Sequence, residues 1–326
     1  MATLMYREAL GQALAEEMAR DPNVFLMGEE VGVYNGAYKV SKGLLDQFGP
    51  KRVVDTPITE LGFAGLGVGA AMLGLRPVIE FMTFNFSMLA LDQVFNSAAK
   101  VRYMSGGQFG CPIVFRGPTG AALQLSAQHS QAMESTYAHY PGLKICTPAT
   151  PADAKGLLKA AIRDNDPVIL MEGELLYAMK GDVPDGDDWI VPLGVADVKR
   201  AGDDVTIITH GKTVHTALQA ANQMAKQDIS AEVIDLRSLR PLDVEAILRS
   251  VHKTNRAIYL EEGWPYVGIG AQIVDIIQNE AFDFLDAPLQ RVTQLDLPMP
   301  YSKNLEKAAK PSAERVVEAC RQVLYV

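Results

Sequence analysis

The sequence predicts an α/β protein made of two open, mostly parallel sheets that are covered by helices. Three observations support this class. The 326 residues are enough for two domains. Short β-rich runs alternate with helical patterns along both halves. Hydrophobic residues make up 48% and charged residues 21%, as in ordinary globular proteins. Because parallel strands need helical crossovers, strands spaced by helices indicate sheets covered on both faces.

The first half begins with a helical pattern in MATLMYREALGQALAEEMAR and continues with alternating strands and helices. A helix is predicted around Ala154, Leu157, Leu158 and Ala161, which follow the i, i+3, i+4, i+7 spacing. The expected strands are the short apolar runs Val24–Met27, Arg52–Asp55, Pro77–Met82, Pro112–Arg116, Leu143–Thr147 and Val168–Glu172.

The second half repeats this alternation after the polar run KGDVPDGDD at 180–188. Strands are expected at Val205–Thr209, Glu232–Leu236 and Ala257–Glu261, and helices at Val214/Ala217/Leu218/Ala221, Val244/Ile247/Leu248/Val251, Ile269/Ile273/Ile276 and Val316/Cys320/Val323. Domain boundaries fall in polar, turn-prone segments. We therefore predict a first domain at 1–185, a linker at 186–198 and a second domain at 199–326.

Composition excludes several classes of protein. Thirty Lys and Arg against 39 Asp and Glu give a net charge of −9, which disfavours general binding to nucleic acid or anionic membranes. The longest uncharged apolar stretch, 61–75, is shorter than the ~20 residues of a membrane-spanning helix. The start lacks the apolar core and cleavage site of a signal peptide. Cys111, Cys146 and Cys320 are an odd number without CxxC pairing, which indicates reduced thiols.

Two glycine motifs resemble nucleotide-binding loops but lack the required context. The run GLGVGA at 65–70 begins about ten residues after the preceding strand, so it falls inside a helix and not at a strand-to-helix turn. Close packing of one helix face through glycines 62, 65 and 69 explains this glycine run better than nucleotide binding does. The run GKT at 211–213 lacks the first glycine of a phosphate loop, and Thr213 near a helix N-terminus accounts for it.

Glu60 is the first candidate for chemistry. DTPITE leaves a strand and enters a helix, Pro57 suits the first helical turn, and Glu60 follows in that turn at the carboxyl end of the strand. Ligands of open α/β sheets bind at these strand ends. The alternative is that Glu60 only complements the helix dipole, which is typically worth under ~1 kcal/mol at an exposed site.

His129 is the second candidate, because it is the only titratable side chain in the polar segment QLSAQHSQ. A histidine bonded to loop backbone is the open alternative. The other histidines lack companions at metal-ligand spacing. Composition and spacing alone therefore indicate a two-domain α/β enzyme without naming its reaction.

Longer runs carry a specific resemblance over nearly the whole chain. DTPITELGFAGLGVGAAMLGLRPVIEFMTFNFSMLALDQVFNSAAKVRYMSGG, PIVFRGPTG, AQHSQ and HYPGLKICTP resemble the β subunits of thiamine-diphosphate-dependent pyruvate dehydrogenase components. IDLRSLRPLD, EEGWPYVGIGAQI and FDFLDAPLQRVTQLDLPMPY resemble the C-terminal domain of the same transketolase-like family. The resemblance implies a pyrimidine-binding fold followed by a transketolase C-terminal-like domain. The short start resembles a bacterial or plastid form, so a bacterial cytoplasm or a plastid stroma is expected.

The resemblance also implies roles for single residues. Glu60 matches the glutamate that hydrogen-bonds the aminopyrimidine ring of thiamine diphosphate and favours its imino tautomer. Met82 and Phe86 match residues that line the pocket of that ring, although core packing is an equal alternative for Met82. His129 matches a histidine that donates a proton during acetyl transfer to lipoamide. A potassium site formed mostly by backbone carbonyls is implied at Ile113, Ala161, Ile162 and Asp164.

One departure from other thiamine enzymes implies a partner. They hold Mg²⁺ and diphosphate with G-D-G followed by Asn, but the Gly-Asp pairs at 181, 186 and 202 are not followed by glycine. An α subunit is therefore expected to supply the Mg²⁺ and diphosphate side of a shared site. The family forms tetramers of two α and two β chains that dock on a dihydrolipoyl acetyltransferase core.

Three alternatives stay open at this point. The β subunit of a branched-chain 2-oxo acid or acetoin dehydrogenase would have the same catalytic residues, with only a different pocket volume. A nicotinamide-binding module is suggested by GLGVGA alone. A docking subunit without catalytic groups is the third. Pyruvate and a lipoyl group are the expected substrates.

Overall fold

The computed structural model describes residues 1–186 and 188–326, which form two compact units. Unit 1 comprises Met1–Thr119 and Thr136–Leu193, and unit 2 comprises Gly120–Ser135 and Gly194–Val326. The sequence analysis did not foresee that 120–135 groups with the second unit. Position 187 of the predicted linker 186–198 lies outside the described residues, and the linker's last two residues already belong to a strand, β9 (Asp197–Arg200).

Unit 1 is built on a parallel sheet in which the strands run β6-β7-β5-β4-β2-β3. These strands coincide with the six predicted runs to within a few residues. Their bounds are β2 (Val24–Gly28), β3 (Val53–Asp55), β4 (Arg76–Glu80), β5 (Val114–Thr119), β6 (Lys144–Cys146) and β7 (Val168–Gly173).

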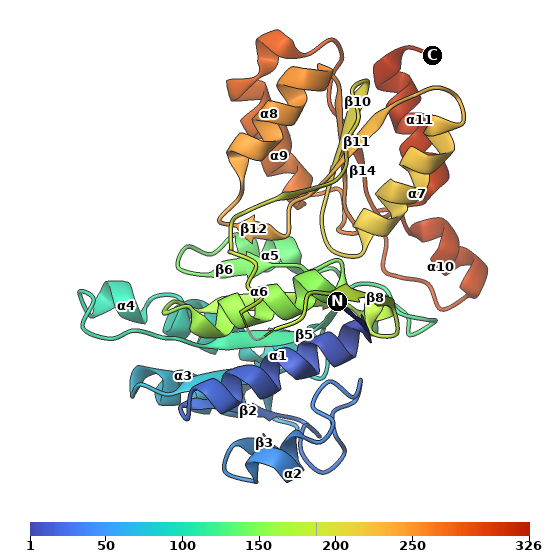
Figure 1. Cartoon of the computed structure of the whole chain (residues 1–326). Helices are drawn as coiled ribbons and strands as arrows, with labels where there is room; N and C mark the ends of the chain where they lie inside the picture. The colour runs from blue at the N-terminus through green and yellow to red at the C-terminus, as the bar shows by residue number, and fades with distance from the viewer. Residues whose placement is uncertain (187) are drawn as a thin grey trace. The chain divides into compact units, whose positions relative to one another are not determined.

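Different helices cover the two faces of this sheet. Val78 of β4 packs in one core cluster with α1 (Tyr6–Arg20) and α6 (Pro151–Arg163), which lie side by side in Figure 1. The next residue, Ile79, points to the opposite face, as alternation along a strand requires, and meets α3 (Glu60–Met72). The remaining helical segments are α2 (Leu44–Phe48), η1 (Ser87–Ala90), η2 (Gln93–Ala98), α4 (Val101–Met104), η4 (Glu174–Leu176) and α5 (Glu134–Ala138), which crosses the boundary between the units.

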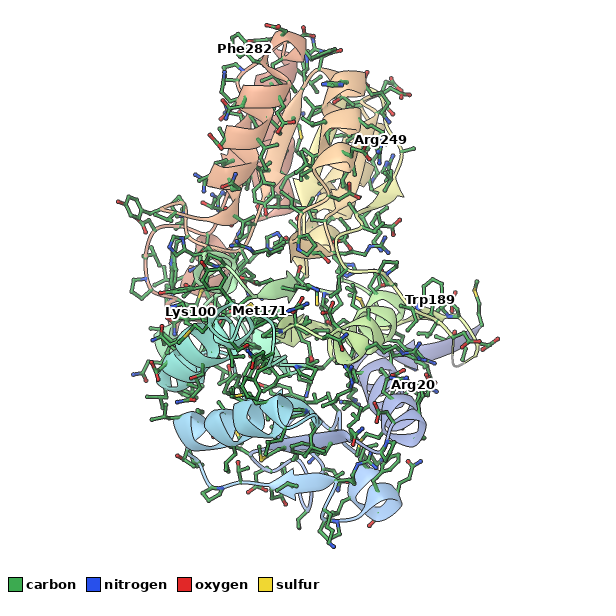
Figure 2. The ribbon with its side chains drawn as sticks, turned by 90° about the vertical axis from the view of Figure 1, so that its left-hand side faces the viewer. Arg20, Lys100, Met171, Trp189, Arg249 and Phe282 are labelled. Atoms are coloured by element: carbon green, nitrogen blue, oxygen red, sulfur yellow. The ribbon has the colours of Figure 1, made fainter. Side chains whose placement is uncertain are left out.

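The polar run at 180–188 is not entirely a linker. Lys180–Val183 forms β8, which pairs antiparallel with β1 (Ala2–Met5), and neither of these strands was predicted. Beyond it, the indole of Trp189, labelled in Figure 2, donates a hydrogen bond to the carbonyl of Ala152 at 2.9 Å. β8 and Trp189 are thus both attached to unit 1.

Unit 2 has a sheet in the order β14-β13-β10-β11-β9. The predicted strands are confirmed as β10 (Val205–Thr209), β11 (Ala231–Asp235) and β13 (Ala257–Leu260), whereas the antiparallel edge strand β9 and the short β14 (Gln290–Val292) were not predicted. Figure 1 shows the sheet between two pairs of helices: α8 (Val244–Thr254) with α9 (Ile269–Glu280), and α7 (Thr213–Ala225) with α11 (Ala313–Leu324). The other elements are η3 (Ala127–His129), β12 (Ser238–Arg240), η5 (Phe282–Phe284) and α10 (Lys303–Ala309).

The glycine run lies inside α3 as predicted, but the glycine that packs against the sheet, Gly67, is not one of the three that were singled out. A Cβ on Gly67 would stand 2.6 Å from the Ile79 side chain, whereas one on Gly69 would meet nothing within 4 Å. The predicted close packing is confirmed at Gly65, where a Cβ would stand 3.3 Å from the Gln93 side chain, and is wrong at Gly69. The side of α3 that meets the sheet carries Phe63, Gly67 and Ala71. Within 1–186 and 188–326, each helix is too short or too polar to cross a bilayer.

Candidate active site

The carboxyl ends of three neighbouring strands of unit 1 meet at one edge of the sheet. β2 lies between β3 and β4, and its last residue, Gly28, is in register with both Asp55 and Glu80. Side chains that follow these strand ends are therefore brought together although they are far apart along the chain. Glu29 follows β2, Glu60 follows β3, and Met82 follows β4.

Glu60 is the first residue of α3 and is 4% exposed. The predicted position in the first turn is confirmed, although Pro57 lies before the helix, whose N-cap is Thr59. An acidic residue that only complements a helix dipole gains at most ~2 kcal/mol even when it is partly buried. Burial of a carboxyl group is costly unless the site uses it, so the position favours the chemical interpretation of Glu60.

Glu29 is a second buried carboxyl group at this edge, and the sequence analysis did not single it out. Burial and the nearby charge of Glu60 raise the pKa of Glu29 to about 7. Its carboxylate accepts a weak hydrogen bond from the backbone N–H of Met82 at 3.3 Å. The run GEEVG after a strand was the available signal, but nothing in the sequence showed which of its acids turns inward.

Two further features of this edge suit a flat, polar ring. Met82 and Phe86 are both half-buried, so each keeps part of its side chain accessible. The hydroxyl oxygen of Thr56 is buried and has no hydrogen-bond partner among the described residues. A buried polar atom without a partner is uncommon and marks a place where a ligand atom can bind. These residues fit the aminopyrimidine end of thiamine diphosphate.

The turn after Glu29 is held by a side chain from β3. The carboxylate of Asp55 accepts the backbone N–H groups of Gly32 at 2.5 Å and Val33 at 2.9 Å. Gly32 has to be small because a Cβ there would stand 2.8 Å from that carboxylate. Asp55 thereby fixes the path of the chain that leaves Glu29.

His129 lies in unit 2, at the end of the short η3 turn, and is half-buried. Its backbone N–H is bonded to the carbonyl of Ser126 at 3.4 Å. Gln124 and Ser126 adopt left-handed φ angles of 58° and 65°, which is costly for residues with a Cβ and is concentrated at functional loops.

All four residues of the implied potassium site lie in unit 1, with Ala161, Ile162 and Asp164 at the C-terminal end of α6 and Ile113 immediately before β5. The guanidinium of Arg76 donates to the carbonyls of Ile162 and Asp164, both at 2.9 Å. The Ala161 carbonyl accepts the N–H of Asp164, and the Ile113 carbonyl accepts that of Val168. Carbonyls at a helix C-terminus attract cations, and here the guanidinium of Arg76 already bonds two of them. No group of three His, Cys, Asp or Glu within 1–186 and 188–326 could hold a metal.

Comparison with known proteins agrees with this architecture. The description "Transketolase, pyrimidine binding domain" matches residues 2–180, and "Transketolase, C-terminal domain" matches residues 194–316. A solved structure titled "Split gene transketolase, inactive beta4 tetramer" superposes with a TM-score of 0.78 over 99% of this chain and 98% of that chain. At 22% identity it shows the fold alone.

Curated relatives are much more similar in sequence. The pyruvate dehydrogenase E1 component subunit beta of Rickettsia felis is 56% identical and covers 98% of both chains. The mitochondrial protein of that name from Caenorhabditis elegans is 56% identical over 100% of this chain and 94% of its own. The Rhizobium meliloti protein is 55% identical over 100% of this chain and 71% of its own. With two transketolase domains and such identity along its whole length, this chain belongs to the family of pyruvate dehydrogenase E1 component β subunits.

Proposed function

We propose that this chain is the β half of an enzyme that oxidatively decarboxylates pyruvate and transfers the acetyl group to lipoamide, towards acetyl-CoA. The observation that carries the proposal is Glu60, a buried carboxyl group at the carboxyl edge of a parallel sheet, in a chain of this family. The proposal gives Glu60 and His129 catalytic roles.

Thiamine diphosphate, when bound, supplies the carbon nucleophile and the electron sink that decarboxylation of a 2-oxo acid requires. Glu60, Met82 and Phe86 are the residues of this chain that would hold its aminopyrimidine end. A thioether and an aromatic face suit a flat heteroaromatic ring. The Thr56 hydroxyl offers a further polar contact.

Glu60 acts in this proposal by sharing a proton with a ring nitrogen. A buried carboxyl group held against a ring nitrogen is placed for general acid–base work on that ring. In this proposal the charge on Glu29 acts electrostatically on Glu60. His129 acts later, by donating a proton as the acetyl group passes to the lipoyl sulfur.

In this proposal the chain supplies only half of the active-site residues. We place the Mg²⁺ and the diphosphate on an α subunit, in a tetramer of two α and two β chains that docks on a dihydrolipoyl acetyltransferase core. Co-purification from its source tests this: an α chain that carries G-D-G and a later Asn should accompany it. The isolated chain is expected to be inactive, and turnover without a partner would overturn the proposal.

We also propose that K⁺ binds at the carbonyls of Ile113, Ala161, Ile162 and Asp164. Their position at the C-terminal end of α6, where the helix dipole favours positive charge, supports this, although the guanidinium of Arg76 already bonds two of these carbonyls. The assembled enzyme should melt at a higher temperature in KCl than in choline chloride at equal ionic strength. Identical melting in the two salts would exclude the ion.

The central experiment is substitution of Glu60 in the assembled enzyme. Glu60→Gln should lower decarboxylation, followed with an artificial electron acceptor, by at least ~100-fold, within the range for acid–base groups. Asp46→Asn is the matched control, because Asp46 is also an acid in the first turn of a helix but is exposed. An effect of Glu60→Gln below threefold, or equal to that of the control, would leave only the helix-dipole role.

The choice of pyruvate over a branched substrate rests on the relatives and is tested by turnover. One methylene in an apolar pocket changes discrimination by about 1–3 kcal/mol. Pyruvate should therefore be preferred to 3-methyl-2-oxobutanoate at least about tenfold. For the compartment we propose a bacterial cytoplasm or a plastid stroma, supported by three buried free thiols and testable by cell fractionation.

A further inference from the structure

The segment that carries His129 is attached to unit 2 by a small number of buried contacts. Ala121, near its start, is fully buried and packs with Met299 and Ala309. The Gly120 N–H donates to the carbonyl of Gln131 at 2.9 Å, so the two ends of the loop are joined to each other.

Ala121 is held at both of its backbone polar groups by one ion pair. Its N–H donates to the Glu262 carboxylate at 2.8 Å, and its carbonyl accepts from the Lys212 ammonium at 2.6 Å. Lys212 and Glu262 are themselves 2.7 Å apart. Both side chains are largely buried, with 14% and 9% exposure. An ion pair out of water needs further hydrogen bonds to offset its desolvation, and here Ala121 supplies two of them.

The parallel sheet of unit 2 explains why Lys212 and Glu262 meet. β10 ends at Thr209 and β13 ends at Leu260, and these two residues are direct neighbours in the register. Lys212 and Glu262 follow three and two residues later, at the same carboxyl edge. The rigid ends of two central strands thus place the pair, which suits it to fix a loop.

The absence of a side chain at Gly120 lets the backbone approach this ion pair closely. Its φ of +79° is unfavourable for other residues, and a Cβ there would stand 2.3 Å from the Glu262 carboxylate and 3.0 Å from the Lys212 nitrogen. The backbone can approach the pair this closely only because residue 120 has no side chain. The close approach of the Gly120 backbone to the ion pair is therefore a specific contact and not an incidental one.

The other end of the segment faces the same charges. Glu134 is buried, and the groups that act on it electrostatically are Glu262, Glu261 and Lys212. Farther along the loop, the Gln124 N–H donates to Glu306 at 2.7 Å. The 120–135 segment is therefore anchored to unit 2 at Ala121 and Gln124, and Gln131, beyond His129, is joined to Gly120 beside the first of these anchors.

We propose that Lys212 and Glu262 are positioning residues. Their ion pair holds both backbone polar groups of Ala121, a contact called the clip below, and thereby fixes the loop on which His129 lies. Neither residue is assigned a contact with substrate or cofactor. The inference rests on the proposed function for the role of His129, but the anchoring itself can be measured separately. Because a misplacement of about 1 Å can cost a reaction about 100-fold, such anchors affect rate strongly.

The test uses the assembled α and β subunits with variants Lys212→Met, Lys212→Arg and Glu262→Gln. Acetyl transfer to a lipoyl domain should fall about tenfold or more in Lys212→Met and Glu262→Gln, while decarboxylation with an artificial acceptor changes less than about threefold. Lys212→Arg keeps the charge and the donors, so it should recover most of the transfer. Glu245→Gln is the control, because it removes an exposed ion pair with Arg249 on α8, labelled in Figure 2.

Hydrogen exchange supplies a readout that does not depend on activity. Peptides spanning 120–126 should exchange about tenfold faster in Glu262→Gln, while peptides of β10 and β13 keep the exchange of the parent enzyme. Unchanged exchange at 120–126 would overturn the clip. So would equal loss of both half-reactions without recovery in Lys212→Arg, which would indicate damage to the fold.

The result also separates this inference from the function on which it rests. If His129→Ala lowers transfer but the clip variants do not, the clip is wrong and the role of His129 stands. If the loop exchanges faster in the clip variants and transfer is unaffected both there and in His129→Ala, the anchoring is supported and the role of His129 is overturned.

Discussion

The carboxyl group of Glu29 lies beside that of Glu60 at the carboxyl edge of the first sheet, although 31 positions separate them in the chain. Burial, and then the charge of Glu60, raise the pKa of Glu29 to about 7. Two carboxyl groups in one dry site cannot both ionise easily. At neutral pH Glu29 is therefore close to the point where it gains or loses its proton.

Glu29→Gln should remove an ionisation near pH 7 from the pH profile of decarboxylation. Below that pH Glu29 is neutral, and above it a second negative charge appears beside Glu60. The amide imitates the neutral form at every pH, so the variant at about pH 8 should behave as the parent enzyme does at about pH 6. Initial rates with an artificial acceptor across this range provide the measurement.

The neighbouring Glu30→Gln serves as the control, since Glu30 is exposed. It should leave the profile unchanged. If the ionisation near pH 7 persists in Glu29→Gln, it belongs to another group and the coupling to Glu60 has no role in the rate.

Glu134→Gln should change how stability depends on pH. Burial, first, and then the charges of Glu262 and Glu261 raise the pKa of Glu134 from 4.5 to about 7. The folded state binds the proton of Glu134 more tightly than the unfolded state does. The stabilisation of the fold by this proton is therefore fully present below pH 4.5 and is lost as the pH rises through 7. At pH 8 the buried, ionised carboxylate of Glu134 lowers the free energy of unfolding by about 3 kcal/mol relative to its neutral form.

The variant should therefore melt several degrees higher than the parent chain at pH 8, with the difference shrinking as the pH falls towards 4.5. Calorimetry at several pH values measures this. Glu245→Gln, which alters an 89% exposed side chain, is expected to show no such trend. A difference that is the same at all pH values would mean that Glu134 does not titrate in this range.

Gly67→Ala and Gly69→Ala in α3 should have opposite effects on stability. The new methyl at 67 would meet the buried Ile79 side chain at 2.6 Å, so about 1–3 kcal/mol of strain outweighs the helix propensity of alanine. At 69 it meets nothing within 4 Å, so the isolated chain should gain up to about 1 kcal/mol. Urea unfolding of the isolated chain compares them, and equal effects would contradict the assigned packing face.

His129→Ala should affect the two half-reactions unequally. A proton donor needed only for acetyl transfer contributes typically 10²–10⁴-fold to that step, so transfer to a lipoyl domain should fall by about 100-fold. Decarboxylation with an artificial acceptor should change much less. Loss of both activities to the same extent would remove the role from His129.

Much of the fold could be predicted from local patterns. The parallel strands of unit 1 were predicted because apolar runs and helical periods alternate, and Glu60 was placed in a first helical turn by a strand end followed by a helix. Helical periodicity could not tell which glycine of α3 meets the sheet, because every face of that helix is apolar or small. The edge strand β9 and the short β14 carry too few apolar residues to stand out.

The sequence by itself determined the alternation of the main parallel strands with helices, the family, and the identity of Glu60 and His129 as candidates. Only the tertiary structure decided that Glu29 lies beside Glu60, that Gly67 packs against Ile79, and that Lys212 and Glu262 hold Ala121. The reason is physical: periodicity along a chain encodes which face of an element is buried. Charge coupling, close packing and ion pairing depend on distances in space, which the register of parallel strands sets between residues remote in sequence.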